Sequence, residues 1–335
     1  MKVFITGGAG YVGSACLRRL LDEGHDAIAF DNLSEGHPLA VPAGRLVKGD
    51  IRDTAALAQA MKAHGAEAVM HFAAATYVGE SVTNPDHHYG NNIGGTLSLL
   101  RAMREVGMQR MLFSSTCATY GDNPKPPMNE QAAQIPCSPY ARTKLAVEWM
   151  IRDFAHAYGL GFTILRYFNA AGADAGGEFG ENHEPETHLI PLLLQVALGQ
   201  RDKLQLYGDD YPTPDGTCLR DYVHTDDLAS AHLLAIAATT PTTAEVFNIG
   251  TGIGQSVKQV LAACEAVTGR RIPVDVVARR PGDAPALVAD PAKLMTQLGW
   301  SPKWPDIHDV VQTAWTWHRR YPKGYTDKAA ALKGR

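Results

Sequence analysis

A glycine-rich turn near the N-terminus constrains the fold of this chain more than any other segment. The turn Thr6-Gly7-Gly8-Ala9-Gly10-Tyr11-Val12-Gly13 follows an apolar run from Val3 to Ile5 and opens an amphipathic stretch that reaches Glu23. A strand, a tight turn and a helix in this order form the first unit of a dinucleotide-binding sheet. Glycines let the backbone approach a pyrophosphate at the helix N-terminus. The pattern therefore predicts a bound dinucleotide, although strand-to-helix turns also use glycine for purely steric reasons.

An acidic residue at the end of the second apolar run sharpens this prediction. Asp31 follows the run Ala27 to Phe30 and lies just under twenty residues after Gly13. At that position a carboxylate accepts hydrogen bonds from the adenosine ribose, and it would repel a 2'-phosphate. The sequence favours NAD over NADP. A solvated aspartate at a strand end is the alternative interpretation.

A tyrosine and a lysine four residues apart indicate acid-base chemistry. Tyr140 and Lys144 would share one face of a helix, because residues at this spacing are neighbours there. Ser138 as N-cap and Pro139 at the first helical position place Tyr140 in the first turn. Positive partial charge at that end of the helix and the ammonium of Lys144 are both expected to favour the phenolate. Alone, the pair could equally be two surface residues.

Hydroxyl side chains are expected beside this pair. The run Arg110 to Phe113 is predicted as a strand that ends in Ser114, Ser115 and Thr116. The carboxyl ends of strands line the ligand crevice of open α/β sheets. Cys117 follows directly, and a small buried thiol is its expected role.

Alternating strand and helix patterns predict an α/β fold, a doubly wound parallel sheet of the Rossmann type with a smaller C-terminal lobe. The pattern changes after Asn169 to a loop rich in glycine and glutamate, followed by a predicted helix from Ile190 to Ala197 and a strand from Val246 to Ile249. We expect residues 1–170, with a return segment of about 221–250, to form the dinucleotide-binding domain. Residues 171–220 and 251–335 would form the second lobe. The predicted strands of the first half are Lys2 to Ile5, Ala27 to Phe30, Arg45 to Lys48, Ala68 to Phe72, Arg110 to Phe113 and Phe162 to Arg166.

Composition excludes several classes of function. The chain has 335 residues, of which 45% are hydrophobic and 20% charged, enough to bury a large core. A net charge of -4 gives no electrostatic footprint for nucleic acid. No apolar run is long enough to cross a bilayer, and the first six residues already form a strand rather than a signal peptide. Five cysteines without a Cys-x-x-Cys pair suggest reduced thiols in a cytoplasmic protein.

With Thr116, Tyr140 and Lys144 in place, the chain resembles the extended short-chain dehydrogenase/reductase family, and within it the UDP-glucose 4-epimerases. The likeness extends along nearly the whole length. The matching motifs are Asp50-Ile51, His71-Phe72-Ala73-Ala74, Val78-Gly79-Glu80-Ser81, Asn91-Asn92, Arg166-Tyr167-Phe168-Asn169-Ala170-Ala171-Gly172, Leu219-Arg220-Asp221-Tyr222 and Arg280-Pro281-Gly282-Asp283.

The resemblance implies two binding sites. The residues implied for NAD are Gly7, Gly10, Tyr11, Val12, Gly13, Asp31, Asn32, Asp50, Ile51, Phe72, Ala73, Ala74, Asn92, Ser114, Tyr140, Lys144 and Tyr167. The residues implied for a UDP-sugar are Thr116, Tyr140, Asn169, His188, Leu189, Gln205, Tyr207, Arg220, Arg280, Asp283 and Leu287. Without the resemblance, the two arginines would be ordinary surface residues, and Leu204 to Tyr207 could be a plain buried strand.

The reaction implied by the resemblance is epimerisation at carbon 4 of a UDP-hexose, which interconverts UDP-glucose and UDP-galactose. Tyr140 takes the proton of the 4-hydroxyl while a hydride passes to NAD+, and the resulting 4-ketose turns and takes the hydride back on its other face. Thr116 hydrogen-bonds the same oxygen, and Lys144 holds the nicotinamide ribose. The resemblance also implies a homodimer formed through helices that include the one bearing Tyr140.

Related activities share the tyrosine and lysine. Nucleotide-sugar 4,6-dehydratases carry an Asp-Glu pair directly after the threonine, where this chain has Cys117-Ala118, and the glutamate typical of UDP-glucuronate decarboxylases is also missing. Thr76 and His188 depart from the epimerase pattern, so UDP-N-acetylglucosamine and UDP-xylose/UDP-arabinose 4-epimerases stay open as alternatives. A catalytically silent NAD-binding protein on the same fold would typically lack Tyr140 or Lys144.

One segment superficially resembles a metal site. In His183-Glu184-Pro185-Glu186-Thr187-His188 the histidines are five apart rather than four, and Pro185 would break a helix presenting both to one ion. The sequence predicts no metal.

Overall fold

The computed structural model describes residues 1–121, 125–280 and 283–333. A seven-stranded sheet forms the centre of the first lobe, and its neighbouring strands are all parallel. Their order across the sheet is β10-β6-β5-β4-β1-β2-β3. The predicted doubly wound parallel sheet is confirmed. The strands are β1 (Lys2–Thr6), β2 (Asp26–Asp31), β3 (Leu46–Lys48), β4 (Ala68–His71), β5 (Arg110–Thr116), β6 (Gly161–Tyr167) and β10 (Ala244–Ile249).

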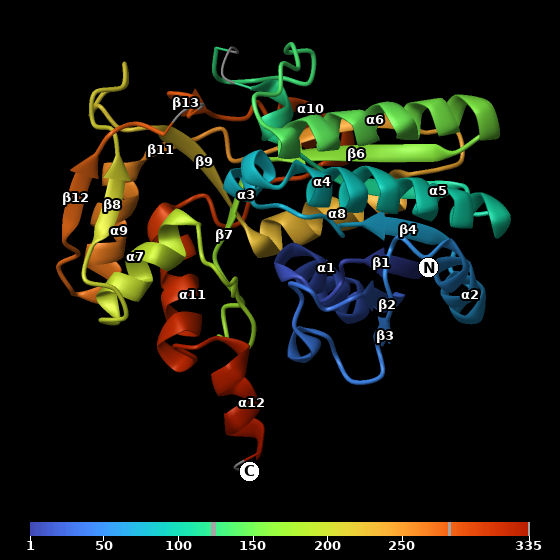
Figure 1. The fold of residues 1–335 in the computed structure, drawn as a ribbon, viewed down its shortest axis with the longest axis horizontal. Helices are drawn as coiled ribbons and strands as arrows, with labels where there is room; N and C mark the ends of the chain where they lie inside the picture. The colour runs from blue at the N-terminus through green and yellow to red at the C-terminus, as the bar shows by residue number, and fades with distance from the viewer. Residues whose placement is uncertain (122–124, 281–282, 334–335) are drawn as a thin grey trace.

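Helices cover both faces of this sheet (Figure 1). On one face, Leu17 of α1 (Tyr11–Asp22) and Leu228 of α8 (Thr225–Ala238) pack in one core with Val3 and Ile5 of β1. On the other face, α2 (Thr54–His64), α5 (Gly95–Glu105) and α6 (Pro139–Tyr158) pack in a second core with Phe4 of β1. Because both faces are buried, the strands are continuous apolar runs rather than alternating ones.

The chain reverses direction across the sheet at β1. From β1 it runs outward through β2 to β3, and it then crosses to β4 on the other side of β1. Ligands of such sheets bind outside the carboxyl ends of the strands at this switch point. The crevice beyond Thr6 and His71, the paired last residues of β1 and β4, is therefore where the fold places a ligand.

The second lobe combines two small sheets with helices, and its helices α7, α9 and α11 share one core. Strand β9 pairs with β7 and β13 in parallel and with β11 antiparallel, while β8 pairs with β12. These strands are β7 (Asn169–Ala171), β8 (Leu204–Tyr207), β9 (Leu219–His224), β11 (Gly254–Ser256), β12 (Val274–Val277) and β13 (Ala286–Leu287). The helices of this lobe are α7 (Leu189–Ala197), α9 (Val257–Thr268) and α11 (Ile307–Arg320), and α12 (Tyr325–Lys333) follows them. Helix α10 (Ala292–Leu298) instead packs on the first lobe, where Leu294 joins the core of α1 and α8 and Lys293 bonds to Glu245 of β10.

Short helical segments complete the first lobe. They are η1 (Pro38–Ala40), α3 (Val78–Thr83), α4 (Pro85–His88), the π-helical turn η2 (Tyr89–Gly94) and η3 (Cys117–Tyr120). Within the described parts of the chain, none of the helices has the length and apolar character needed to span a bilayer.

Candidate active site

The glycine turn between β1 and α1 packs closely against neighbouring backbone. Gly7 has φ +72°, and a Cβ at this position would lie 2.5 Å from the backbone nitrogen of Ala73. A Cβ on Gly13 would lie 2.2 Å from the carbonyl oxygen of Gly7. Gly10 is the N-cap of α1 and provides no side-chain cap, so N–H groups of the first turn lack a side-chain acceptor. The turn thus has the shape and the polarity of a pyrophosphate cradle.

Asp31 lies at the end of β2, directly beside this turn. Its Oδ2 accepts a hydrogen bond from the Ala9 amide at 3.0 Å, and its Oδ1 accepts one from the Leu33 amide at 2.8 Å. Burial raises the pKa of Asp31, and these two amides oppose the shift. The carboxylate therefore fixes the turn as well as standing where a ribose is predicted to bind.

Asp50, one of the residues implied for NAD, is held by two neighbouring side chains. Asn32 donates to Asp50 at 3.3 Å, and Arg52 forms an ion pair with the same carboxylate at 2.7 Å. The bond from Arg52 holds the pKa of Asp50 well below its usual range. Ile51 is buried in the second core, and Val12 packs against the first.

The carboxyl end of β4 is tied to α6 by Asn92, which lies in the π-helical turn η2. Its Oδ1 accepts from the Ala75 amide at 2.8 Å, and its Nδ2 donates to the Ala75 carbonyl and to Thr143 Oγ1. Ala73 and Ala74 precede this contact, and Phe72 packs on His232. The segment after β4 is thereby held next to the glycine turn and to the helix that bears Tyr140.

Lys144 and Ser114 meet inside the first lobe. The Lys144 ammonium donates to the Ser114 carbonyl at 2.9 Å, and the Ser114 hydroxyl lies 2.7 Å from the Tyr167 hydroxyl. Burial lowers the pKa of Lys144 to about 7, against the opposing charge of Glu148.

Tyr140 lies in the first turn of α6, as the sequence predicted. Ser138 is the N-cap, its hydroxyl accepting from the Ala141 amide at 3.2 Å, and Pro139 is the first helical residue. Burial raises the pKa of Tyr140, the nearby Tyr167 adds to this rise, and a hydrogen bond with Thr116 opposes it. The expected acidification of Tyr140 is therefore not produced by the protein's own groups, because desolvation outweighs them. Thr116 is the last residue of β5, which runs three residues beyond its predicted end at Phe113.

Apart from Thr116 and Tyr140 of the first lobe, the residues predicted to bind a UDP-sugar lie in the second lobe and at its border. Asn169 begins β7, and Leu189 begins α7 with His188 as its N-cap. The Tyr207 hydroxyl donates to Gln205 at 2.9 Å within β8. Leu287 is partly buried and packs against a cluster that contains Cys117, the residue after Thr116.

Two predicted arginines share one carboxylate. Arg220 lies 3.5 Å from one oxygen of Asp283, and Arg280 lies 3.2 Å from the other. Arg220 also donates to the Ala284 carbonyl at 2.8 Å, and the Arg280 guanidinium lies 4.5 Å from the centre of the Tyr207 ring. Pro281 and Gly282 of the same motif lie outside the described residues. Both guanidinium groups thus lie beside the Asp283 carboxylate.

A buried ion pair that was not predicted from the sequence joins β6 to α6. Arg166 of β6 makes a bidentate contact with Glu148 of α6, at 2.9 Å and 2.5 Å, and Ser115 donates to Glu148 at 2.6 Å. Both charged side chains are almost fully buried. No sequence motif predicts this contact, because the two residues lie on different elements.

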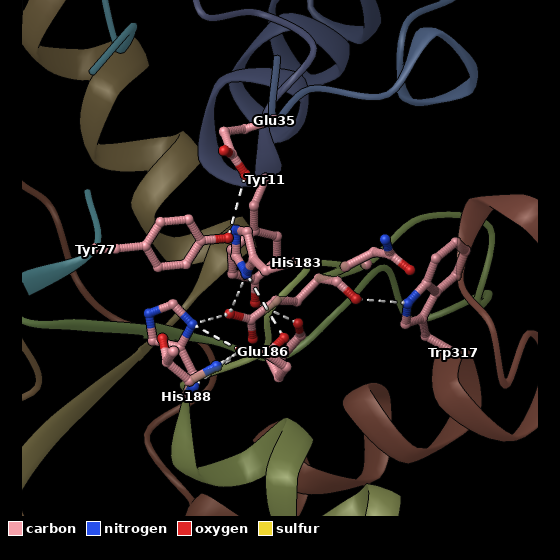
Figure 2. Close-up of polar contacts among 12 residues, drawn as sticks. Tyr11, Glu35, Tyr77, His183, Glu186, His188 and Trp317 are labelled. Carbon is pink, nitrogen blue, oxygen red and sulfur yellow. Dashed lines mark hydrogen bonds and ion pairs between the residues drawn. The ribbon is translucent and has the colours of Figure 1, made fainter. Parts of the chain in front are cut away.

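The segment that resembles a metal site is not helical. A helix was expected to be necessary to present His183 and His188 to one ion, whereas residues 181–188 form an irregular loop before α7. The loop brings both imidazoles together with Glu186 and with Glu181, a residue outside the motif considered in the sequence (Figure 2). The spacing rule for a helix therefore does not apply here.

Comparisons with known proteins agree with this architecture. Residues 3–250 match the model of the NAD dependent epimerase/dehydratase family. A UDP-glucose 4-epimerase of Halalkalibacterium halodurans is 47% identical over 327 residues, which cover 97% of this chain and 98% of that protein.

Two solved structures are also similar along almost the whole chain. UDP-glucose 4-epimerase from Brucella ovis in complex with NAD is 48% identical with a TM-score of 0.90, covering 93% of this chain and 96% of its own. The enzyme of that name from Bifidobacterium longum, in complex with NAD+ and UDP, is 36% identical with a TM-score of 0.93, covering 97% and 100%. With a family model that matches well over half of its residues and a relative of such identity along its length, the chain belongs to the NAD dependent epimerase/dehydratase family.

Proposed function

We propose that this protein is an NAD-dependent 4-epimerase of UDP-hexoses that interconverts UDP-glucose and UDP-galactose. The observation that carries the proposal is the convergence of Thr116, Tyr140 and Lys144 at the carboxyl end of β5, beside a glycine turn that has no room for side chains. The names of the relatives described above support the same substrate and the same cofactor.

The residues of the first lobe fit NAD. The glycine turn and the N-terminus of α1 would hold the pyrophosphate, Asp31 the adenosine ribose, and Lys144 the nicotinamide ribose. When bound, NAD supplies reversible hydride transfer at carbon 4, and the positive charge of its oxidised ring favours the phenolate of Tyr140.

Proton transfer is assigned to Tyr140. Its phenolate takes the proton of the sugar 4-hydroxyl and later returns it, while Thr116 hydrogen-bonds the same oxygen. Burial favours the neutral phenol, so the base is formed only where positive charge is brought close. Burial also lowers the pKa of Lys144 to about 7, and strongly perturbed pKa values are typical of active sites.

Substrate binding is assigned to the second lobe. Arg220 and Arg280, which share Asp283, are close enough together to engage the two phosphates of one diphosphate, and guanidinium groups bind phosphate in bidentate fashion. Asn169 is assigned to the phosphate and sugar. His188, Leu189, Gln205 and Tyr207 complete the proposed nucleotide contacts. We accordingly assign residues 1–170 and 221–250 to NAD, and 171–220 and 251–335 to the nucleotide sugar.

A direct test is the conversion of UDP-galactose to UDP-glucose by the purified protein without any added hydride donor or acceptor. The proposal requires turnover under these conditions, because the cycle has no net redox change. A protein that binds NAD(H) but leaves UDP-galactose, UDP-N-acetylgalactosamine and UDP-arabinose unchanged would instead be a catalytically silent member of the family.

The purified protein is expected to carry NAD(H), and Asp31→Ala is expected to weaken its retention, because the ribose hydroxyls lose a charged acceptor. Acid precipitation followed by chromatography of the supernatant measures the retained nucleotide. Asp22→Ala, at the exposed far end of α1, is the matched control. Recovery of NADP, or of no nucleotide together with strict dependence on NADPH, would contradict the proposal.

Leu287 is proposed to set the choice between hexose and N-acetylhexosamine. It pairs in register with Arg220 and packs on the cluster that contains Cys117. We expect UDP-galactose to be the better substrate and UDP-N-acetylgalactosamine a poor but measurable one. Leu287→Tyr should abolish the second activity selectively, and Leu287→Ser should raise it, by tens to a few hundredfold at about 1–3 kcal/mol per steric change. If Leu287→Tyr lowers both activities equally at an unchanged melting temperature, Leu287 does not set the choice between the two substrates.

A homodimer through the face formed by α6 and its neighbours completes the proposal. Trp149 and Tyr158 of α6 are 59% and 50% exposed, and Tyr89 of η2 is 42% exposed. Exposed aromatic side chains that recur on adjacent elements are typical of protein interfaces. Trp149→Glu should shift the protein from dimer to monomer in analytical ultracentrifugation, whereas an unchanged sedimentation coefficient would place the interface elsewhere.

A further inference from the structure

The loop that enters α7 gathers two carboxylates and two imidazoles at one point. These are Glu181, His183, Glu186 and His188, which we call the Glu-His cluster. One potential ligand atom from each residue lies within 4.8 Å of all the others. Figure 2 shows His183 and His188 directed towards the Glu186 carboxylate, with Tyr11 and Tyr77 beside them. Of the four residues, His188 also has a proposed role as a nucleotide contact, and none takes part in proton or hydride transfer in the proposed reaction.

The distances within the cluster resemble those of a metal coordination shell. Nδ1 of His183 lies 3.3 Å from Oε1 of Glu181 and 3.6 Å from Oε2 of Glu186. Nδ1 of His188 lies 2.7 Å from Oε1 of Glu181 and 3.2 Å from Oε1 of Glu186. Four ligands at tetrahedral angles and about 2.05 Å from a zinc ion are about 3.3 Å apart. The four separations, two of which end on different oxygens of Glu186, run from 2.7 to 3.6 Å and lie on both sides of this value.

Two of these atoms are buried without a well-aligned hydrogen bond. Oε1 of Glu181 and Nδ1 of His183 are shielded from solvent and take part in no hydrogen bond of acceptable geometry, although they lie 3.3 Å apart and Oε1 of Glu181 also lies 2.7 Å from Nδ1 of His188. Glu181 is 4% exposed. A buried carboxylate oxygen without a hydrogen bond is costly, unless it is paired with or coordinates a cation. This oxygen and this nitrogen converge inside the cluster, where one cation would contact both.

The surroundings orient the ligands. Oε1 of Glu186 accepts from the amides of Thr187 and His188 at 2.7 Å and 2.9 Å. The Glu181 carbonyl accepts from the Trp317 indole at 3.0 Å, which ties the loop to α11. Outer contacts of this kind hold metal ligands in their coordinating orientation.

We propose that the Glu-His cluster binds one divalent transition-metal ion of the zinc class. Two imidazole nitrogens with two carboxylate oxygens suit Zn²⁺ rather than Mg²⁺ or Ca²⁺, which prefer oxygen ligands. Two carboxylates and two neutral imidazoles around a doubly charged ion give a site with no net charge, which burial requires. The His188 side chain is 47% exposed and leaves the ion a path from solvent. Coordination of the ion by these four side chains would hold residues 181–188 against α7 and α11.

A proton-based alternative uses the same geometry. Burial acts to lower the pKa of His188, but Glu181 and Glu186 outweigh it and raise the pKa to about 10; the pKa of His183 is raised to about 9 by the same two carboxylates. Two imidazolium groups would balance the two carboxylates without any metal. The metal site predicts uptake of one ion per chain, and this alternative predicts none. Uptake can be measured without substrate, so the result does not depend on the proposed reaction.

The test uses the full-length protein, stripped with a chelator and titrated with Zn²⁺ in competition with a chromophoric chelator. We expect one Zn²⁺ per chain. Glu181→Gln and His183→Asn should each weaken binding by at least about a hundredfold, the upper end of what loss of an outer contact costs. His308→Asn is the matched control, since His308 pairs with Asp306 at 3.0 Å on an exposed helix terminus, and it should leave binding unchanged.

Cobalt gives a second readout that does not depend on the variants folding. Stoichiometric Co²⁺ in the stripped, unmodified protein should give the intense visible absorption of a tetrahedral site. Failure of the unmodified protein to take up one equivalent of Zn²⁺ would overturn the proposal. So would a weak, octahedral-type Co²⁺ spectrum, or an equal loss of affinity in His308→Asn.

Discussion

Replacement of Tyr140 by phenylalanine is expected to lower turnover by at least about a hundredfold, which corresponds to about 2.7 kcal/mol of lost transition-state stabilisation. The variant keeps the ring that α6 positions behind Ser138 and Pro139, but it has no proton to exchange with the sugar hydroxyl. Affinity for UDP should remain nearly intact. The measurement is steady-state epimerisation of UDP-galactose together with calorimetric titration of UDP.

The matched control is Tyr158→Phe, at the other end of the same helix. Tyr158 is half exposed, so loss of its hydroxyl should leave turnover within a factor of two or so. If a folded Tyr140→Phe protein turns over within a few-fold of the parent, another group is the base. Retention of NAD(H) by the variant would show that the cofactor site survives the change.

Replacement of Glu148 by glutamine is expected to cost about 3–5 kcal/mol of unfolding free energy. Arg166 would keep its full charge in a site where both side chains are almost fully buried, with no carboxylate opposite it. Ser115 would lose a charged acceptor as well. Guanidinium unfolding at equal NAD occupancy measures the loss, because a ligand that binds only the folded state would otherwise mask it.

An exposed pair provides the control for this measurement. Arg19 and Glu23 are 2.6 Å apart on α1 with side chains 36% and 45% exposed, so Glu23→Gln should cost less than about 1 kcal/mol. The double variant Glu148→Met, Arg166→Met should recover much of the loss, because it removes the unpaired charge. A cost below about 1 kcal/mol for Glu148→Gln would mean that water or a rearranged partner neutralises Arg166.

Local signals in the sequence were sufficient to predict the glycine turn and the start of α6. Gly7 and Gly13 have steric requirements that can be recognised in sequence, because only glycine fits where a Cβ would meet backbone. Ser138 and Pro139 predict the start of α6 through capping and a fixed φ, and the structure begins the helix there. The start of α6 depends on neighbours within a few residues, and the glycine spacing is recognisable locally even though Gly7 packs against Ala73.

Features that depend on tertiary contact were not predictable. The contact of Glu181 with His188 arises because an irregular loop folds back on itself, and no helical or strand period describes such a loop. The rise in the pKa of Tyr140 is caused by burial, which the sequence of α6 does not reveal. Strands β7 and β13 are only three and two residues long, so they carry no period of their own and exist through pairing with β9.

The position of β10 at the edge of the large sheet governs the order in which the protein can be assembled during synthesis. Strand β6 can pair with β5 at once, but its second partner, β10, is made only after residues 168–243. Arg110 at the start of β5 bonds to the carbonyls of Ile236 and Thr239 near the end of α8. At about 5–20 residues per second, the ribosome leaves the edge of β6 open for several seconds. An unpaired edge is a template for pairing with other chains. Nascent chains that stall before Ile249 therefore expose the unpaired edge of β6 and are prone to aggregate. In a truncated protein that ends near residue 170, this edge would never be paired.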